Sequence, residues 1–225
     1  MNVLLLIGSP KVKQSNSEAL ADCLLELLDR EGVTTRKIKI YQALKEEKGM
    51  EELLSSINTC DALILLFPLY VDSLPSGVIK VMEAIAEQRS DPHSSPPRAD
   101  GQTFMAICNS GFPEANHNDT ALAICRCFAE KTGLQWLGGL PLGGGEAIGG
   151  KPLTSFGGMF RKQINALKMA AEAIVESKKL PAEAVALFRK TSIPRWLYVC
   201  CGHFGWRRQA GKNGVLKRIR EQPYK

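Results

Sequence analysis

Three segments of the 225-residue chain carry residue types that bind ligands, and each follows a short apolar run. The first segment, residues 8–17, leads into a helical pattern and combines positive charge with hydroxyl and amide groups. These polar residues are Ser9, Lys11, Lys13, Ser15, Asn16 and Ser17. Because a helix N-terminus presents unpaired backbone N–H groups and partial positive charge, the combination predicts a phosphate site. Taken alone, the segment also fits a capped turn with solvated lysines, and it lacks the Walker A and GxGxxG spacings.

The second segment, residues 68–75, is apolar and aromatic where a short polar turn would ordinarily follow a buried strand. Tyr70 offers a ring for stacking, and the backbone of residues 69–72 could bond the edge of a heterocycle. Local packing of Leu69 and Leu74 beneath the loop is the alternative. The segment reads Pro68, Leu69, Tyr70, Val71, Asp72, Ser73, Leu74 and Pro75.

The third segment follows another apolar run and begins with Asn109, Ser110 and Gly111. The first two side chains supply hydrogen-bonding groups, and Gly111 lets the backbone approach a ligand closely. Alone, this segment fits a plain turn. Together, the three segments predict a phosphate pocket, a stacking wall and a polar edge.

Strands and helices alternate along the chain, and this alternation positions the three segments. Short apolar runs predict strands at 3–7, 36–40, 62–67, 103–108 and 135–142, of which 36–40 is the more exposed. Helical patterns are expected at 17–30, 50–58, 76–88, 114–131, 160–178 and 181–190. Asn16 or Ser17 is expected to cap the first helix, and Gly32 to end it.

Five consecutive strand–helix units predict an α/β fold with a parallel sheet covered by helices on both faces. The economical strand order is 2-1-3-4-5, that of a flavodoxin-like three-layer sandwich. Ligands bind such sheets beyond the carboxyl ends of the strands, at the switch point between strands 1 and 3. The three segments follow strands 1, 3 and 4, so they should meet there. We expect this domain to span residues 1–180, and a C-terminal helical and aromatic extension to span 181–225.

The three segments resemble the motifs of the NADPH-dependent FMN reductase and NAD(P)H:quinone oxidoreductase family of flavodoxin-like proteins. The resemblance covers about residues 1–178, and the second segment, with Lys80 behind it, is the most specific part. It implies non-covalently bound FMN, whose phosphate contacts Ser9, Lys11, Ser15, Asn16 and Ser17. The isoalloxazine would be bordered by Pro68 to Asp72 and by Asn109 to Gly111. Lys11 stands where the family commonly has arginine, which keeps the charge but loses the bidentate geometry.

The resemblance further implies an oxidoreductase that takes hydride from NAD(P)H and passes it to a small electrophile such as a quinone or a nitro compound. The flavin would carry the chemistry, so no side chain is expected to be an obligatory acid or base. A homodimer is also expected from the resemblance. Two alternatives stay open: a one-electron carrier of flavodoxin type, and a non-enzymatic flavin-binding module addressed by a basic tail.

Composition is that of an ordinary globular chain, with 44% hydrophobic and 23% charged residues. No apolar run reaches the roughly 18–20 residues that cross a bilayer, and the start of the chain does not fit a signal peptide. The seven cysteines include no CxxC pair, so we expect reduced thiols in the cytoplasm and no metal site. Residues 145–151 fit GxxxxGK, but Pro152 stands where magnesium binding needs Ser or Thr, so a flexible loop at the flavin edge is preferred.

The formal net charge of +6 belongs to the C-terminal tail. Residues 205–225 hold seven Lys or Arg and one Glu, which leaves 22 bases and 22 acids in residues 1–204. An aromatic stretch, residues 193–206, precedes this tail. Packing against the body or a dimer contact is the simplest role, and a membrane-surface anchor is the next. Nucleic-acid binding is least favoured, because no nucleic-acid motif accompanies the charge.

Overall fold

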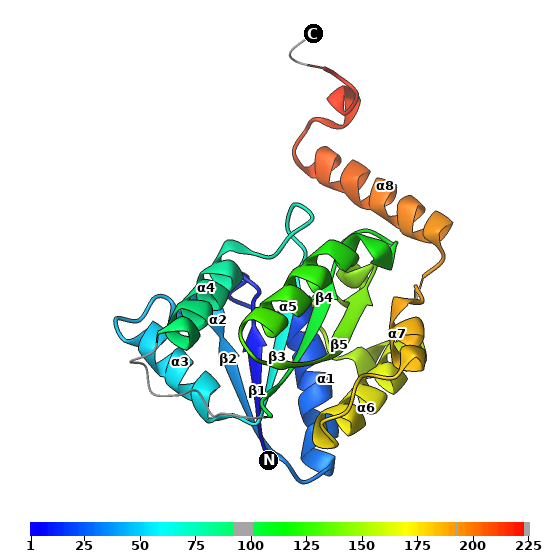
Figure 1. Cartoon of the computed structure of the whole chain (residues 1–225). Coiled ribbons are helices and arrows are strands. Elements are labelled where there is room, and N and C mark those ends of the chain that lie inside the picture. The colour runs from blue at the N-terminus through cyan, green and yellow to red at the C-terminus, as the bar shows by residue number, and fades with distance from the viewer. Residues whose placement is uncertain (92–100, 192, 223–225) are drawn as a thin grey trace. The chain divides into compact units, whose positions relative to one another are not determined.

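The computed structural model describes residues 1–91, 101–191 and 193–222, and the chain divides into two compact units, Met1–Thr191 and Ser192–Lys225 (Figure 1). The first unit contains a parallel sheet of β1 Asn2–Ile7, β2 Thr34–Lys39, β3 Ala62–Pro68, β4 Thr103–Asn109 and β5 Gln135–Leu142. The strand order is β2-β1-β3-β4-β5. The predicted fold class and strand order are therefore confirmed.

Helices cover both faces of this sheet. One face packs against α1 Asn16–Arg30, α6 Arg161–Val175 and α7 Ala182–Arg189. The other packs against α3 Gly49–Thr59, α4 Ser76–Ser90 and α5 Asp119–Lys131. Shorter elements complete the unit: α2 Ile40–Ala43 and the 3₁₀ turns η1 Ala115–Asn118, η2 Gly145–Ile148 and η3 Leu153–Phe156. The layers form the predicted three-layer sandwich.

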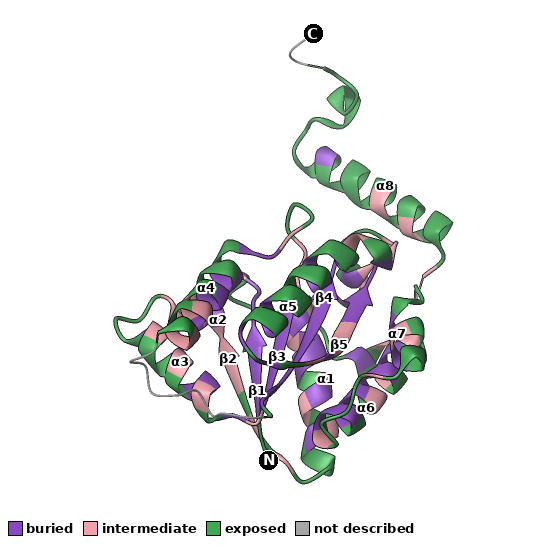
Figure 2. Ribbon diagram, viewed as in Figure 1, coloured by how far each residue is buried: buried purple, intermediate pink, exposed green. Residues whose placement is uncertain are grey.

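The strands supply both cores because successive side chains point to opposite faces of a sheet. In β1, Val3, Leu5 and Ile7 face α1 and α6, while Leu4 and Leu6 face α3 and α4. The buried residues accordingly concentrate in the central strands, whereas β2 at the sheet edge is partly exposed (Figure 2). This placement explains why the central strands are continuous apolar runs and β2 alternates.

The ends of α1 show how local chemistry sets the position of the first loop. Ser15 is the N-cap, and its Oγ accepts a hydrogen bond of 3.1 Å from the backbone N–H of Glu18. The expectation that Asn16 or Ser17 caps this helix was wrong by one or two positions, because both residues already have places in its first turn. Gly32 follows the helix with φ +72° and donates its N–H to the carbonyl of Asp29, as expected for a terminating glycine.

The first unit extends past residue 180, because α7 packs on α6 and β5. A functional division of the chain at residue 180 stays a prediction. The second unit consists of α8 Arg195–Lys212 and the 3₁₀ turn η4 Leu216–Arg218. Among the helices that the structure describes, none is both long and apolar enough to cross a membrane.

Candidate functional site

The carboxyl ends of the strands carry the loops that the sequence singles out. Loop 1 (residues 8–15) follows β1, loop 3 (69–75) follows β3, loop 4 (110–114) follows β4 and loop 5 (143–152) follows β5. Because β1, β3 and β4 are neighbours in the sheet, loops 1, 3 and 4 emerge side by side. We call this side of the sheet the carboxyl edge.

Asn109, the last residue of β4, ties the neighbouring segments together. Its side chain is 4% exposed, and its Nδ2 donates to Ser17 Oγ at 2.8 Å and to the carbonyl of Phe67 at 3.0 Å. The carbonyl of Asn109 also accepts from the N–H of Leu69 at 2.8 Å. One buried amide therefore joins the start of α1, the end of β3 and the start of loop 4. The sequence predicted Asn109 at the site but not this linking role, which spans 92 residues of sequence.

Loop 1 and the first turn of α1 form a cluster of polar donors. Ser9, Ser15 and Ser17 are buried, whereas Lys11 is exposed. Ser9 Oγ accepts from the N–H of Lys11 at 3.4 Å. The N–H groups of the first helical turn have no carbonyl partner within the helix, and the helix dipole adds positive potential there. This end of α1 therefore has the backbone donors, hydroxyls and charge that suit an anion.

Asn16 points to loop 5, which was expected as a flexible loop at the flavin edge but not as a source of ligand contacts. Its Oδ1 accepts from the N–H of Gly150 at 2.9 Å. Gly150 has φ +72°, and a Cβ at that position would lie 2.2 Å from the carbonyl oxygen of Gln14. Gly143 approaches loop 4 as closely, since its Cβ would lie 2.2 Å from the carbonyl oxygen of Pro113. These glycines therefore let loop 5 pack against loops 1 and 4 in addition to any ligand.

Loop 3 contains a strained two-residue turn. Tyr70 and Ser73 exchange backbone hydrogen bonds of 3.0 Å in each direction, and between them Val71 has φ +48° and Asp72 has φ +57°. Such turns favour Asn-Gly, and the left-handed region is unfavourable for a β-branched residue. The side chains of this turn are also exposed to solvent, Val71 by 98% and Tyr70 by 44%. Strain of this kind often marks a ligand-contacting segment.

Loop 4 contains one buried residue, Ser110, followed by two exposed residues, Gly111 and Phe112. Ser110 is buried: its N–H donates to the carbonyl of Leu142 at 2.9 Å, and its Oγ accepts from Asn118 Nδ2 at 3.3 Å. Gly111 is exposed, as is Phe112, whose ring lies 4.7 Å from the ring of His117 between centroids. Ser110 thus shapes the loop, while Gly111 and Phe112 face outward.

Exposed apolar side chains gather on these loops. Among the described residues of the first unit, the exposed large apolar side chains are Met1, Val12, Tyr70, Val71, Ile79, Phe112, Ile124 and Met159. Four of these eight belong to loops 1, 3 and 4. Val12, Tyr70, Val71 and Phe112 form what we call the apolar rim of the carboxyl edge. A rim of this composition suits a flat apolar ligand or a protein partner.

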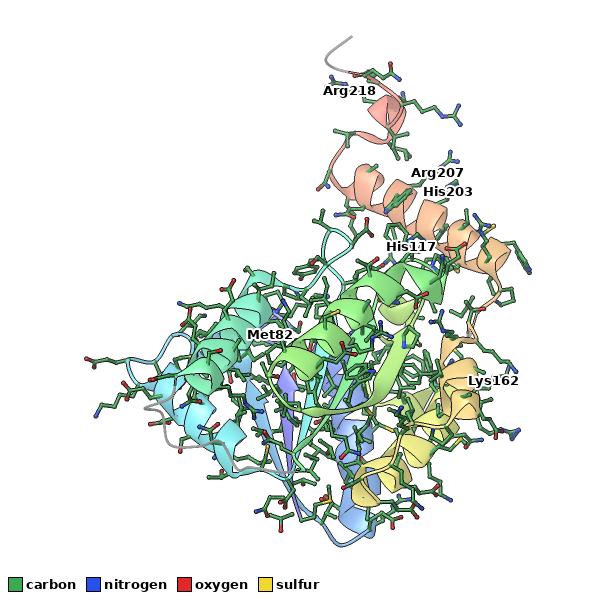
Figure 3. The ribbon with its side chains drawn as sticks, viewed as in Figure 1. Met82, His117, Lys162, His203, Arg207 and Arg218 are labelled. Atoms are coloured by element: carbon green, nitrogen blue, oxygen red, sulfur yellow. The ribbon has the colours of Figure 1, made fainter. Side chains whose placement is uncertain are left out.

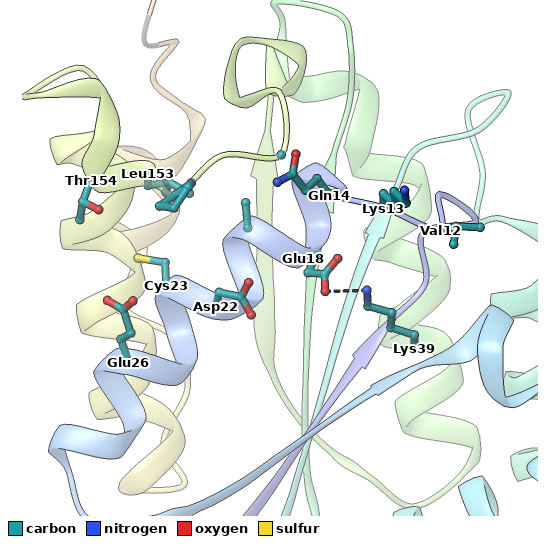
Figure 4. Close-up of a pocket in the computed structure, with 13 residues that line it drawn as sticks. Val12, Lys13, Gln14, Glu18, Asp22, Cys23, Glu26, Lys39, Leu153 and Thr154 are labelled. Carbon is teal, nitrogen blue, oxygen red and sulfur yellow. Dashed lines mark ion pairs between the residues drawn. The ribbon is translucent and has the colours of Figure 1, made fainter.

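A groove of about 900 Å³ lies beside this cluster rather than between loops 3 and 4. It runs along α1, where Glu18, Asp22 and Glu26 line it together with Lys13 and Lys39 (Figure 4). Glu18 Oε1 pairs with Lys39 Nζ at 2.7 Å and with Lys37 Nζ at 3.6 Å. Lys13 is the one polar residue of the first segment that lines the groove, and none of the residues expected to contact FMN does so. Its carboxylates would repel a phosphate, so the groove is not the predicted anion site.

A family model, Flavodoxin_2, described as a flavodoxin-like fold, matches residues 1–148 of the chain. No curated protein sequence matches the chain.

Several solved structures share this fold. One is an FMN-dependent NADH-azoreductase from Bacillus anthracis in complex with FMN, at 15% identity and TM-score 0.57, covering 77% of this chain and 99% of that one. Another is an NAD(P)H:quinone oxidoreductase from Methanothermobacter marburgensis, at 15% identity and TM-score 0.55, covering 77% and 96%. A third is a putative quinone reductase from Klebsiella pneumoniae, at 16% identity and TM-score 0.59, covering 80% and 87%. At these identities the similarity concerns the fold.

Proposed function

The chain belongs to the flavodoxin-like family Flavodoxin_2, and we propose that it is an FMN-dependent NAD(P)H oxidoreductase acting on a small electrophile such as a quinone or a nitro compound. The similar structures named as an FMN-bound azoreductase and as quinone reductases support this proposal. The observation that carries it is Asn109, which joins the start of α1 to β3 and loop 4 through two side-chain hydrogen bonds.

The residues at the carboxyl edge fit FMN by the chemistry of their donors. A phosphate requires donors and positive charge, and the first turn of α1, the Ser9, Ser15 and Ser17 hydroxyls and Lys11 offer both. Asn16 keeps its amide N–H₂ for the same anion, because only its Oδ1 is engaged by Gly150. We therefore assign the phosphate to these five side chains, with loops 3 and 4 flanking the ring system.

The ring contacts would come from Pro68, Leu69, Tyr70, Val71 and Asp72 on one side and from Asn109, Ser110 and Gly111 on the other. These residues differ in their exposure to solvent. Ser110 turns inward to hold loop 4, whereas Tyr70, Val71 and Gly111 are exposed to solvent. Backbone groups of loops 3 and 4 therefore supply much of the polar edge.

FMN, when bound, accepts hydride from NAD(P)H and delivers it to the acceptor. The chain's own contribution is placement. Loops 1, 3 and 4 hold a fixed arrangement through Asn109, and the apolar rim shields the ring face from water and admits a flat acceptor. We assign no side chain as an obligatory acid or base.

The test is the visible absorbance of the purified full-length protein, before and after incubation with FMN and then with NADPH. We expect a flavin spectrum that NADPH bleaches and that a quinone restores. A protein that neither contains nor takes up flavin would contradict the proposal. A flavin that NADPH does not bleach would instead favour a flavin-binding module, and accumulation of a stable one-electron-reduced form would favour a carrier.

We further propose that two copies associate through the carboxyl edge and that the protein works in the cytoplasm. The apolar rim supports the first idea, since exposed apolar side chains gathered on three loops suit a protein partner. The seven free thiols support the second, since thiols persist in a reducing compartment. Val71→Asp should lower the molar mass measured by light scattering from that of a dimer to that of a monomer. An unchanged mass would contradict this arrangement.

A further inference from the structure

The second unit contains a helix, α8, with a long run of uncharged and mainly apolar residues that extends around its circumference. Residues 196–206 of α8 form a run of eleven without Lys, Arg, Asp or Glu. Trp196, Leu197, Tyr198 and Val199 are consecutive, and consecutive residues in an α-helix point about 100° apart. A helix that is apolar all round ordinarily lies in a non-aqueous environment.

Most of this apolar surface is uncovered within the second unit. Trp196 is 68% exposed, Phe204 71% and Trp206 67%. Ala210 is the one described residue of α8 that is buried. The second unit, with α8 and η4 alone, therefore does not bury these aromatic side chains, and a partner from outside the unit could cover them.

The charged residues in and around this helix are all basic as far as residue 220. Residues 193–220 hold seven Lys or Arg and no Asp or Glu. Arg207, Arg208 and Lys212 lie on the C-terminal turns of α8, and Arg207 and Arg218 extend away from the ribbon of this unit (Figure 3). Glu221 follows and pairs with Arg218 at 2.6 Å. The charge of this unit therefore favours an anionic partner.

We propose that residues 195–220 bind the surface of an anionic lipid bilayer. Indole rings favour the boundary between headgroups and acyl chains, and basic side chains beside it contact lipid phosphates. The uncharged run is about 16 Å long, at about 1.5 Å per residue, which is far short of the roughly 30 Å hydrocarbon layer. The helix would thus lie in the interface, with residues 196–206 at the acyl boundary and the basic turns among the headgroups.

Other partners account for only half of these observations. A second α8 would bury the aromatic residues but bring two basic segments together, and their charges would repel. Nucleic acid would satisfy the charges but leave an eleven-residue uncharged run exposed. A bilayer surface satisfies both, and stable attachment to membranes ordinarily combines an apolar and a polybasic signal in this way.

The test is flotation of the full-length protein with vesicles of phosphatidylcholine containing about one third phosphatidylglycerol, compared with phosphatidylcholine alone. We expect binding to the anionic vesicles that weakens as salt is raised. Trp196 and Trp206 are two of the three tryptophans, so the emission should shift to shorter wavelength and be quenched by brominated lipid.

Two variants of α8 and one matched control separate the contributions. Arg207→Gln/Arg208→Gln/Lys212→Gln should lower the partition coefficient by about two orders of magnitude. Trp196→Ser/Phe204→Ser/Trp206→Ser should greatly reduce flotation with the anionic vesicles although all charges remain. The control, Arg161→Gln/Lys162→Gln/Lys168→Gln, removes the same charge from exposed positions of α6, where Figure 3 shows Lys162, and should bind as the unaltered protein does.

Several outcomes would overturn the proposal. These are no flotation, equal binding to neutral vesicles, an equal loss of binding in the α6 control, or tighter binding to double-stranded DNA than to anionic vesicles. Self-association lost in the aromatic variant, without vesicle binding, would overturn it in favour of a second copy. Circular dichroism and the thermal midpoint of the first unit verify that each variant is folded, and flavin binding plays no part in the readout.

Discussion

A buried side-chain amide lies at each end of the parallel strands. The two amides differ in the segments that they hold together. At the carboxyl edge Asn109 joins α1, β3 and loop 4. At the opposite edge, where the strands begin, Gln102 Nε2 donates to the carbonyls of Ile57 at 2.6 Å and Cys60 at 2.9 Å. We call this side the amino edge.

The two amides differ in whether the segments that they hold are closed or exposed. Gln102 Oε1 accepts from the Arg89 guanidinium, which also donates to the carbonyl of Thr132 at 2.8 Å. At the amino edge these polar groups therefore bond to one another. Asn109 instead supports loops whose tips stay exposed, including the strained Val71. A buried amide alone therefore does not mark a site. An amide that holds exposed, strained and donor-rich loops in place does.

The largest combined effect on stability and FMN binding is expected for Asn109→Leu, which keeps the approximate size of the side chain and removes both hydrogen bonds. Ser17 Oγ and the carbonyl of Phe67 lose their partner, so the free energy of unfolding should fall by about 2–3 kcal/mol. Because the start of α1 and loop 4 are no longer joined, FMN affinity should fall at least about tenfold. Denaturant unfolding and titration with FMN measure the two effects, and retained FMN affinity would remove Asn109 from the site.

Gln102→Leu is the matched change at the amino edge. It leaves the carbonyls of Ile57 and Cys60 and the Arg89 guanidinium without this partner, so we expect a loss of about 2–4 kcal/mol in the free energy of unfolding. FMN affinity of the folded protein should not change, because the amino edge lies at the other end of the strands. A loss of affinity like that of Asn109→Leu would break the comparison.

These contacts also mark what could be predicted from the sequence. The strand β5 was predicted with its bounds, and the other strands to within two residues, because apolar runs and turn residues are local signals. The helix pattern at 114–131 divides into η1 and α5, and Ile40 begins α2 rather than ending β2. These differences fall at the ends of elements, where local patterns are weakest.

The site was less predictable, for a physical reason. Asn109 and Ser17 are 92 residues apart, and Asn16 and Gly150 are 134 apart, so no local pattern pairs them. The residues of loop 3 were predicted, but not the strained turn at Val71, since its sequence lacks the Asn-Gly signal of such turns. A helical and aromatic extension was expected at 181–225, but the helix α8 was not located within it, because the aromatic stretch has no helical period to detect.

A third expected effect concerns pH at the amino edge. Burial raises the pKa of the Cys60 thiol to about 11 from its ordinary 9.0. Between these values the unfolded chain releases a proton that the folded chain retains, so the free energy of unfolding falls as pH rises from about 9 to about 11. Below pH 9 this contribution is fully present.

Cys60→Ala should flatten that decline by about 1 kcal/mol at pH 10, measured by denaturant unfolding at pH 8 and 10. Cys127, which is exposed, supplies the control: Cys127→Ala should leave the slope unchanged. Equal slopes for all three proteins would show that the Cys60 thiol does not contribute to this pH dependence.

The smallest effect tests whether backbone strain has a different meaning at the two edges. Val71 has φ +48° in loop 3, and Ser177 has φ +52° just after α6, at the amino edge, where its carbonyl accepts from Gln135 Nε2. Glycine relieves about 1–2 kcal/mol of left-handed strain but loses about 0.5–1 kcal/mol in chain entropy. Val71→Gly and Ser177→Gly should therefore each stabilise the fold by about 0.5–1 kcal/mol.

Activity should separate the same two variants. Val71→Gly loosens the exposed tip of loop 3 and removes an apolar rim side chain, so kcat/KM for a quinone should fall by about 2- to 10-fold. Ser177→Gly lies at the closed edge and should leave kcat/KM unchanged. If both variants gain stability and neither loses activity, the strain at Val71 is only a feature of the turn, and loop 3 would contact the ligand through its backbone and Tyr70 instead.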